Sequence, residues 1–283
     1  MKVLVTGSQG FTGRYVKEEL IKNNHEVFDL DSNLLDKKAL DIEIQSKEID
    51  AVIHLAAIAF VQHSDVNAIY ENNIMGTRNL LNTLARYAPN IKHVLIASSA
   101  NVYGNAKVEK ITEDTPLNPA NDYAISKVAM EYMAKLWMDR LPITITRPFN
   151  YTGVGQSEDF VIPKIVRHFK EKKDFIELGN VEVWREFNDV RSIASIYQKL
   201  IKLKPVFGAV NLCSGIAYSL NEIIEIFSFI TNHKINIKVN KDLIRKGEVK
   251  NLTGDPDKLK SVIGDNKFFD IKETIHWMVN NHI

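Results

Sequence analysis

The stretch Thr6-Gly7-Ser8-Gln9-Gly10-Phe11-Thr12-Gly13 decides the fold. It follows the apolar, β-branched run 2–6, which predicts a strand, and it precedes segment 14–23, whose apolar residues have helical spacing. The glycines allow a tight turn, in which backbone N–H groups can approach a pyrophosphate at the N-terminus of the following helix. Because the turn lies directly between a predicted strand and a predicted helix, the sequence predicts a dinucleotide-binding site.

Strand-like and helix-like segments alternate through the rest of the first half of the chain. The predicted strands are 26–30, 51–55, 94–97 and 143–146, and segment 72–87 is a predicted helix with Leu80, Leu81 and Leu84 on one face. Apolar runs that alternate with helices indicate parallel strands buried on both faces. We therefore predict an α/β fold, a Rossmann-type doubly wound parallel sheet with a smaller C-terminal substrate-binding lobe.

The pattern changes after Pro148, where turn residues become frequent and no clear period follows. The run 209–212 (AVNL) is typical of another buried strand, so the chain is expected to return to the sheet. We expect a dinucleotide-binding Rossmann domain over residues 1–150, with the return around 188–214. The substrate-binding lobe is then expected to comprise residues 151–187 and 215–283.

Composition excludes several kinds of protein. A formal net charge of +1 over 283 residues gives no bulk field that would favour nucleic acid or an anionic membrane. No apolar run approaches the ~20 residues of a membrane span, and the N-terminus has no signal-peptide pattern. The one cysteine, Cys213, has no His or Cys at ligand spacing, so we expect no metal site. We expect a cytoplasmic protein with neither a nucleic-acid nor a membrane partner.

An acidic residue about 20 positions after the glycine turn is expected to hold the adenosine ribose of a dinucleotide. Asp31, at the end of the second predicted strand, has this position. A carboxylate there accepts hydrogen bonds from ribose hydroxyls and repels a 2′-phosphate. Ser32 and Asn33 follow, and no arginine is adjacent. The expected cofactor is NAD(H) or NADP(H), and Asp31 favours NAD(H).

Tyr123 and Lys127 lie one helical turn apart, and Ser99 follows the predicted strand 94–97. Ligands in such folds bind at the carboxyl ends of the strands, so these three side chains can meet at one site. The lysine ammonium is expected to lower the pKa of the tyrosine, which could then exchange a proton with a substrate oxygen. His54, at the end of a predicted strand, is expected to be a packed core residue with no chemical role.

The chain resembles the extended short-chain dehydrogenase/reductase family, in particular its nucleotide-sugar branch of NAD-dependent epimerases and dehydratases. In the first half, the matching stretches are VTGSQGFTG (5–13), HLAA (54–57), NNIMGT (72–77), SSANVYG (98–104), YAISK (123–127) and RPFNYTGVGQ (147–156). In the C-terminal part they are WREFNDV (184–190), RKGEV (245–249) and TGDP (253–256). The resemblance implies an enzyme that acts on a nucleotide-diphosphate sugar.

The resemblance also implies roles for individual residues. Those implied for catalysis are Ser99, Tyr123 and Lys127. Those implied for cofactor binding are Gly7, Gly10, Phe11, Thr12, Gly13, Asp31, Leu55, Ala56, Ala57, Asn73, Tyr123, Lys127 and Pro148. Those implied for substrate binding are Asn150, Val161, Lys164, Arg185, Arg245 and Glu248. Arginine is suited to this task because its guanidinium binds a diphosphate through paired hydrogen bonds.

Two residues bear on the reaction. Dehydratases of this family carry an acid just after the catalytic serine or threonine, whereas this chain has Ala100 and Asn101. Neither is a general acid, so a 4,6-dehydratase is not expected.

The short segment between the second and third strands and the stretch FVIPKIV (160–166) resemble GDP-4-keto-6-deoxymannose reductases. We therefore expect NAD(P)H-dependent 4-keto reduction of a nucleotide-linked 4-keto-6-deoxy sugar, in deoxysugar or cell-surface polysaccharide biosynthesis.

Two alternatives stay open. SSANVYG is equally similar to NAD-dependent nucleotide-sugar C4-epimerases, and some proteins of this fold are non-catalytic dinucleotide-binding regulators. The resemblance further implies a homodimer, because such proteins often pair through helices that include the Tyr/Lys helix. An apolar stripe of Met130, Met133, Ala134 and Trp137 could form that interface or could equally belong to the core.

Overall fold

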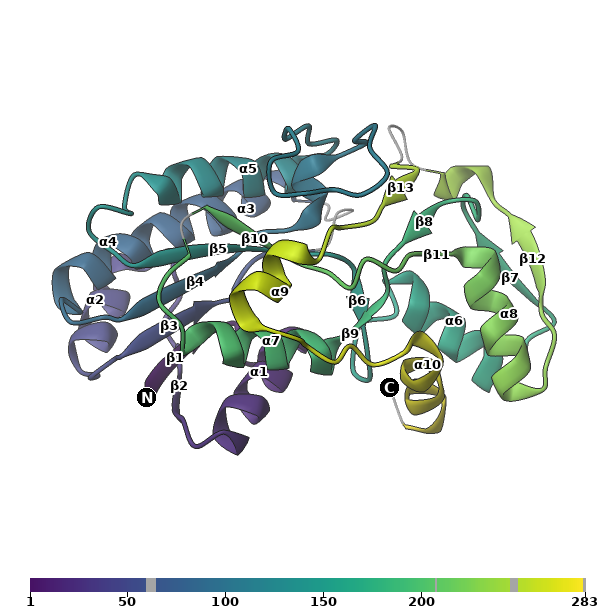
Figure 1. The fold of residues 1–283 in the computed structure, drawn as a ribbon, viewed down its shortest axis with the longest axis horizontal. Helices are drawn as coiled ribbons and strands as arrows, with labels where there is room; N and C mark the ends of the chain where they lie inside the picture. The colour runs from purple at the N-terminus through teal and green to yellow at the C-terminus, as the bar shows by residue number, and fades with distance from the viewer. Residues whose placement is uncertain (60–64, 207, 245–248, 282–283) are drawn as a thin grey trace.

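A parallel sheet forms the centre of the computed structural model, which describes residues 1–59, 65–206, 208–244 and 249–281 (Figure 1). Within these residues the strand order is β10-β5-β4-β3-β1-β2, and every neighbouring pair is parallel. The strands are β1 (Lys2–Thr6), β2 (Glu26–Asp29), β3 (Ala51–His54), β4 (His93–Ala97), β5 (Ile143–Pro148) and β10 (Ala209–Leu212). The fold class predicted from the sequence is confirmed.

Helices cover both faces of this sheet (Figure 1). One face carries α2 (Lys37–Gln45), α4 (Thr77–Tyr87) and α5 (Asp122–Lys135), and the other carries α1 (Phe11–Lys22), α7 (Val190–Ile201) and α9 (Asp257–Ile263). Alternate residues of β1 face the two layers: Leu4 packs with α2 and α4, whereas Val3 and Val5 pack with α1 and α7. This alternation explains why the strands are apolar throughout.

The direction in which the chain adds strands to the sheet reverses between β1 and β3. From β1 the chain runs outward to β2 and then crosses back to β3 on the other side of β1. Ligands of open α/β sheets bind at such a switch point, beyond the carboxyl ends of the strands. The glycine turn lies at this point, since it follows β1 directly and leads into α1.

A second lobe is built on a separate apolar core. Its helices are α6 (Val161–Lys170), α8 (Leu220–Thr231) and α10 (Ile271–Asn280), and its strands are β7 (Phe175–Leu178), β8 (Trp184–Arg185), β11 (Tyr218–Ser219), β12 (Asn236–Val239) and β13 (Asn251–Leu252). Phe169 of α6 stacks on Phe227 of α8, with ring centroids 5.2 Å apart. Two further short strands, β6 (Tyr151–Thr152) and β9 (Asn188–Asp189), pair beside this lobe.

Several local predictions need correction. Strand β2 ends at Asp29, two residues before Asp31. The helix predicted over 72–87 is two elements, a π-helical segment Glu71–Gly76 and α4, preceded by the short helix α3 (Val66–Tyr70). In the proposed dimer stripe, Met130 and Ala134 are buried inside the sheet–helix core, and Met133 and Trp137 pack against it. That stripe is therefore a core stripe, because α5 turns this face toward β4 and β5.

Candidate active site

The glycine turn has the geometry of a pyrophosphate cradle. Gly7 has a φ of +69°, and a Cβ atom there would lie 2.8 Å from the backbone nitrogen of Ala56. A Cβ atom on Gly13 would lie only 2.1 Å from the carbonyl oxygen of Gly7, so side chains at either position would open the turn. No side chain caps α1 at Gly10. The N-terminus of α1 is thus suited to an anion, and these residues fit a dinucleotide.

The residues predicted around the cradle are held by hydrogen bonds within the protein. The hydroxyl of Thr6 accepts a hydrogen bond from the backbone N–H of Ala56 (3.1 Å), which fixes the segment after β3. Asn73 is buried, accepts from the N–H of Ile58 (2.9 Å), and donates to the hydroxyl of Ser126 (3.0 Å). Asn73 therefore ties the post-β3 loop, which contains Leu55, Ala56 and Ala57, to helix α5.

Phe11 and Thr12 connect the cradle to the segment that follows β5. The ring of Phe11 stacks on that of Tyr151, with centroids 6.1 Å apart, and the hydroxyls of Thr12 and Tyr151 are 2.7 Å apart. Tyr151 comes three residues after Pro148, which ends β5, and directly after Asn150. The first turn of α1 is thus positioned against the segment in which substrate contacts are expected.

Ser99, Tyr123 and Lys127 are brought together at the carboxyl end of β4. Asn121 caps α5 by accepting the backbone N–H of Ala124 (2.9 Å), so that Tyr123 lies in its first turn. The ammonium of Lys127 donates to the carbonyl of Ala97 (2.8 Å), the last residue of β4. All three side chains belong to buried residues, and Lys127 Nζ lies 5.9 Å from the centre of the Tyr123 ring.

The structure reverses the expected pKa shift of the tyrosine. Burial raises the pKa of Tyr123 to about 12, although a hydrogen bond with Ser99 opposes the shift. Burial also lowers the pKa of Lys127 to about 8, and the charge of Glu131 only partly offsets this. The prediction that the ammonium lowers the pKa of Tyr123 was wrong, because desolvation of the phenolate is the larger effect. At neutral pH the tyrosine is a protonated, potential proton donor.

Ser99 is oriented by capping the short 3₁₀ helix Ala100–Tyr103. Its hydroxyl oxygen accepts hydrogen bonds from the backbone N–H of Asn101 (3.2 Å) and from the Asn101 side-chain amide (3.1 Å). Because both contacts use the oxygen as acceptor, the hydroxyl proton can be donated elsewhere. Asn101 thus positions Ser99 and supplies no acid, and Ala100 beside it is buried.

A buried ionic network beneath these residues was not found from the sequence. Arg147 donates to both carboxylate oxygens of Glu131, from Nε (2.9 Å) and from Nη2 (2.6 Å). Glu131 also accepts the hydroxyl of Ser98 (2.5 Å), and Arg147 donates to the hydroxyl of Tyr103 (2.8 Å). The network joins α5, β5 and the end of β4, so it fixes the elements that carry the catalytic candidates. No local spacing signals the pair, because Glu131 and Arg147 lie 16 residues apart on different elements.

The residues predicted to bind substrate belong to several different segments of the chain. Asn150 is exposed, and its carbonyl accepts the N–H of Asn188 (2.9 Å). Arg185 donates to the backbone carbonyls of Trp184 (2.8 Å), Val249 and Lys250 (3.3 Å).

Val161 begins α6, and the ammonium of Lys164 donates to the carbonyl of Glu177 (2.7 Å). Arg245 and Glu248 lie outside the described residues. Lys164 is therefore held within the second lobe.

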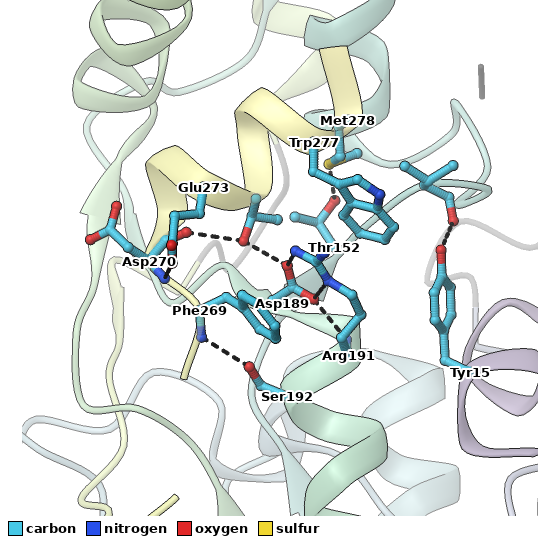
Figure 2. Close-up of polar contacts among 12 residues, drawn as sticks. Tyr15, Thr152, Asp189, Arg191, Ser192, Phe269, Asp270, Glu273, Trp277 and Met278 are labelled. Carbon is cyan, nitrogen blue, oxygen red and sulfur yellow. Dashed lines mark hydrogen bonds and ion pairs between the residues drawn. The ribbon is translucent and has the colours of Figure 1, made fainter. Parts of the chain in front are cut away.

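Helix α10 joins the second lobe to the dinucleotide side of the molecule. Figure 2 shows the guanidinium of Arg191 between the rings of Phe269 and Trp277, at 4.1 Å and 3.8 Å from their centres. Asp189 accepts Arg191 Nη2 (2.6 Å) and the hydroxyl of Thr274 (2.8 Å). Trp277 in turn meets the ring of Tyr15 on α1 edge-on, with centroids 6.0 Å apart. The contacts fix α1 relative to α10.

His54 is a packed residue that links two elements of the sheet–helix core. It is buried, with one ring nitrogen 2.7 Å from the hydroxyl of Thr6 and the other 2.8 Å from that of Thr77. Burial, together with the charge of Lys127, lowers its pKa to about 3. The ring is therefore neutral at physiological pH and joins β1 to α4. In the described part of the chain, no three His, Cys, Asp or Glu side chains are grouped so that they could hold a metal ion.

The sheet order and the glycine turn define a dinucleotide-binding α/β protein. Residues 3–213 match the NAD dependent epimerase/dehydratase family. The chain belongs to this family, as the resemblance within its sequence predicted, and it is an NAD(P)-dependent enzyme. Among the described helices, none has the length and apolar character needed to cross a membrane.

Three known proteins illustrate the relationship. A GDP-6-deoxy-D-talose 4-dehydrogenase of Aggregatibacter actinomycetemcomitans is 32% identical over 291 residues, which cover 100% of this chain and 98% of that protein. A GDP-6-deoxy-D-mannose reductase of Pseudomonas aeruginosa is 28% identical over 99% of this chain and 96% of that protein. A candidate epimerase from Burkholderia cenocepacia, whose crystal structure is known, is 41% identical in sequence. Its structure matches with a TM-score of 0.93 over 99% of this chain and 97% of that chain.

Proposed function

We propose that the protein reduces the C4 carbonyl of a GDP-linked 4-keto-6-deoxyhexose, with NADH or NADPH as the reductant. The observation that carries the proposal is full-length similarity to a 4-dehydrogenase of GDP-6-deoxy-D-talose, whose named activity is the reverse of a 4-keto reduction. The P. aeruginosa relative supports the same chemistry, since it is a reductase of a GDP-6-deoxyhexose. The site supports it because Ala100 and Asn101 offer no acid for elimination of water.

The three buried side chains have complementary tasks in this reaction. When bound, the reduced dinucleotide supplies a hydride to C4. Tyr123 donates its phenolic proton to the carbonyl oxygen, which becomes the C4 hydroxyl, and is left as a phenolate. Lys127 stabilises that phenolate by its charge. The Ser99 hydroxyl donates a hydrogen bond that positions the C4 oxygen of the sugar. A tyrosine whose pKa is raised to about 12 is already protonated for this direction.

The proposal predicts a distinctive pH profile. The rate of reduction is expected to fall above about pH 8, because the pKa of Lys127 is lowered to about 8 and the neutral amine no longer stabilises the phenolate. Tyr123 does not cause the fall, since it stays protonated to about pH 12. The measurement is kcat/KM for the keto sugar from about pH 6 to about pH 10. In Lys127→Arg, where the charge persists, residual activity should lose this fall; a fall at the same pH would assign it to another group.

The substrate assignment is tested by following reduced-cofactor oxidation. GDP- and dTDP-4-keto-6-deoxy sugars are generated in place by the matching dehydratases and offered with NADH and with NADPH. Consumption with the GDP sugar, and little with the dTDP sugar, is the expected result. Consumption only with the dTDP sugar would correct the base, and the products would identify the configuration at C4.

A nucleotide-sugar C4-epimerase is the second candidate. The 41% identity to a candidate epimerase across the whole chain favours it. An epimerase would consume no external cofactor and would instead invert C4 of a plain UDP- or GDP-hexose with bound NAD⁺. This outcome in the same assay would overturn the reductase proposal.

We further propose that the protein forms a homodimer through the outer face of α5. Ile125, Tyr132 and Leu136 are exposed by 42%, 59% and 79%, and their spacing aligns them on one helical face. Leu136→Glu is expected to weaken association at least tenfold, because a charge would enter the apolar contact. Light scattering across a dilution series measures this. Phe229→Glu, at an 86% exposed residue of α8, is the matched control, and a monomeric wild-type protein would contradict the proposal.

A further inference from the structure

Glu43 of α2 holds the turn that follows β2. Its carboxylate accepts the backbone N–H of Asp31 (3.1 Å) and the backbone N–H of Ser32 (2.8 Å). The side chain is only 13% exposed, and it is paired with the ammonium of Lys47 one helical turn later. Glu43 therefore places a fixed carboxylate directly behind the residue expected to hold the adenosine ribose.

This carboxylate is ionised under all physiological conditions. Burial alone would raise its pKa, but the hydrogen bonds from Lys47 and from the Asp31–Ser32 turn outweigh burial and lower the pKa of Glu43 to about 2. The negative charge is thus a permanent property of the turn. It adds to that of Asp31, whose side chain is exposed beside it.

Two cations near the turn, Lys47 and Lys17, are already engaged. Lys47 donates to Glu43 and to the carbonyl of Asp29 (3.2 Å). Lys17 forms an ion pair with the Asp29 carboxylate at 2.7 Å. The carboxylates of Asp29, Asp31 and Glu43 outnumber these two ammonium groups. The turn therefore has a net negative charge. A phosphate bound beside Asp31 would need N–H donors or a free cation, and the amides of Asp31 and Ser32 donate to Glu43.

We propose that Glu43 is a cofactor-specificity residue, which disfavours a 2′-phosphate next to Asp31 by occupying the amide donors of the turn and by its charge. The preference for NADH over NADPH then depends on a side chain twelve residues beyond Asp31, on a different element. This inference concerns only the dinucleotide, so it does not depend on which sugar is reduced.

The test measures binding rather than turnover. Dissociation constants for NADH and NADPH, and for 5′-AMP and adenosine 2′,5′-bisphosphate as probes of the ribose end, are determined by calorimetry on the wild-type protein and variants. Glu43→Gln keeps one acceptor oxygen, so only one of the two turn N–H groups can still be accepted, and it removes the charge. It is expected to shift the NADH-to-NADPH affinity ratio toward NADPH by about tenfold, the scale of one unit charge at a partly buried site.

Two further variants separate charge from folding. Lys47→Met leaves the Glu43 charge unneutralised, so it is expected to shift the ratio in the opposite direction, further toward NADH. Glu48→Gln removes an exposed carboxylate that is paired with Lys2, and it should leave the ratio unchanged. Thermal melting of each variant establishes that it is folded.

The outcomes distinguish the proposal from its alternatives. A wild-type protein that binds NADPH more tightly than NADH would overturn it at once. An unchanged ratio in folded Glu43→Gln would do so too, as would a shift of Lys47→Met in the same direction as Glu43→Gln. A failure of the 4-keto reductase assay would leave these binding ratios intact, so the two ideas fail separately.

Discussion

Replacing Tyr123 with phenylalanine is expected to lower the turnover of ketone reduction by about 10²- to 10⁴-fold, the usual contribution of a positioned general acid. The change removes the only atom of the side chain that can give a proton, and it leaves the buried ring in place. The loss corresponds to about 2.7–5.5 kcal/mol of transition-state stabilisation. Stopped-flow or steady-state oxidation of the reduced cofactor with saturating keto sugar measures it.

Binding and chemistry can be separated in the same variant. Tyr123→Phe should still bind NADH, since the cradle residues Gly7 and Gly13 are unchanged. Tyr87→Phe is the matched control, because Tyr87 is the last residue of α4 and lines the same surface hollow as Lys2 at the amino end of β1. Near-normal turnover of Tyr123→Phe would mean that another group supplies the proton, and the mechanism would have to be abandoned.

The dinucleotide cradle could be predicted because its cause is local. Gly7 needs a positive φ, and Gly13 must allow the carbonyl of Gly7 to approach within a distance that no Cβ atom permits. Such backbone requirements appear in the sequence as glycines at fixed spacing. The parallel strands were predictable for a similar reason, because burial on both faces makes each of them apolar throughout.

Features that depend on tertiary contacts were predicted poorly. The pKa of Tyr123 shifts upward because the folded chain buries it, and no motif reports the depth of burial. Glu43 is not part of any motif, and its contacts to Asp31 and Ser32 arise only when α2 packs behind β2. The ion pair of Glu131 with Arg147 joins two elements that become neighbours only in the fold.

The helices of the second lobe were missed for a different reason. Pro163 lies within α6, where a proline ordinarily argues against a helix. It is the third residue of that helix, and backbone N–H groups of the first turn have no intrahelical partner to lose. Helix α8 contains apolar residues around most of its circumference, including the exposed Phe229, so it shows no clean period.

Replacing Arg147 with methionine is expected to lower the free energy of unfolding by about 3–5 kcal/mol, the cost of leaving one member of a buried ion pair alone. The side chains of Arg147 and Glu131 are 6% and 1% exposed, so water cannot replace the lost guanidinium. Among the described residues, Glu131 would then keep the hydroxyl of Ser98 as its hydrogen-bond donor. Urea denaturation followed by circular dichroism measures the change.

The exposed pair of Arg167 with Glu158 provides the matched control. Both side chains are more than 40% exposed, and Arg167→Met should cost less than about 1 kcal/mol, because solvent screens the pair. The double variant Arg147→Met with Glu131→Leu should recover part of the loss, since it removes the uncompensated buried charge. A loss of the same size in Arg167→Met, or no recovery in the double variant, would show that side-chain packing rather than the buried carboxylate controls stability here. The expected pattern instead makes the network a rigid support that holds β5 and α5 in place, and with them the lysine and tyrosine of the site.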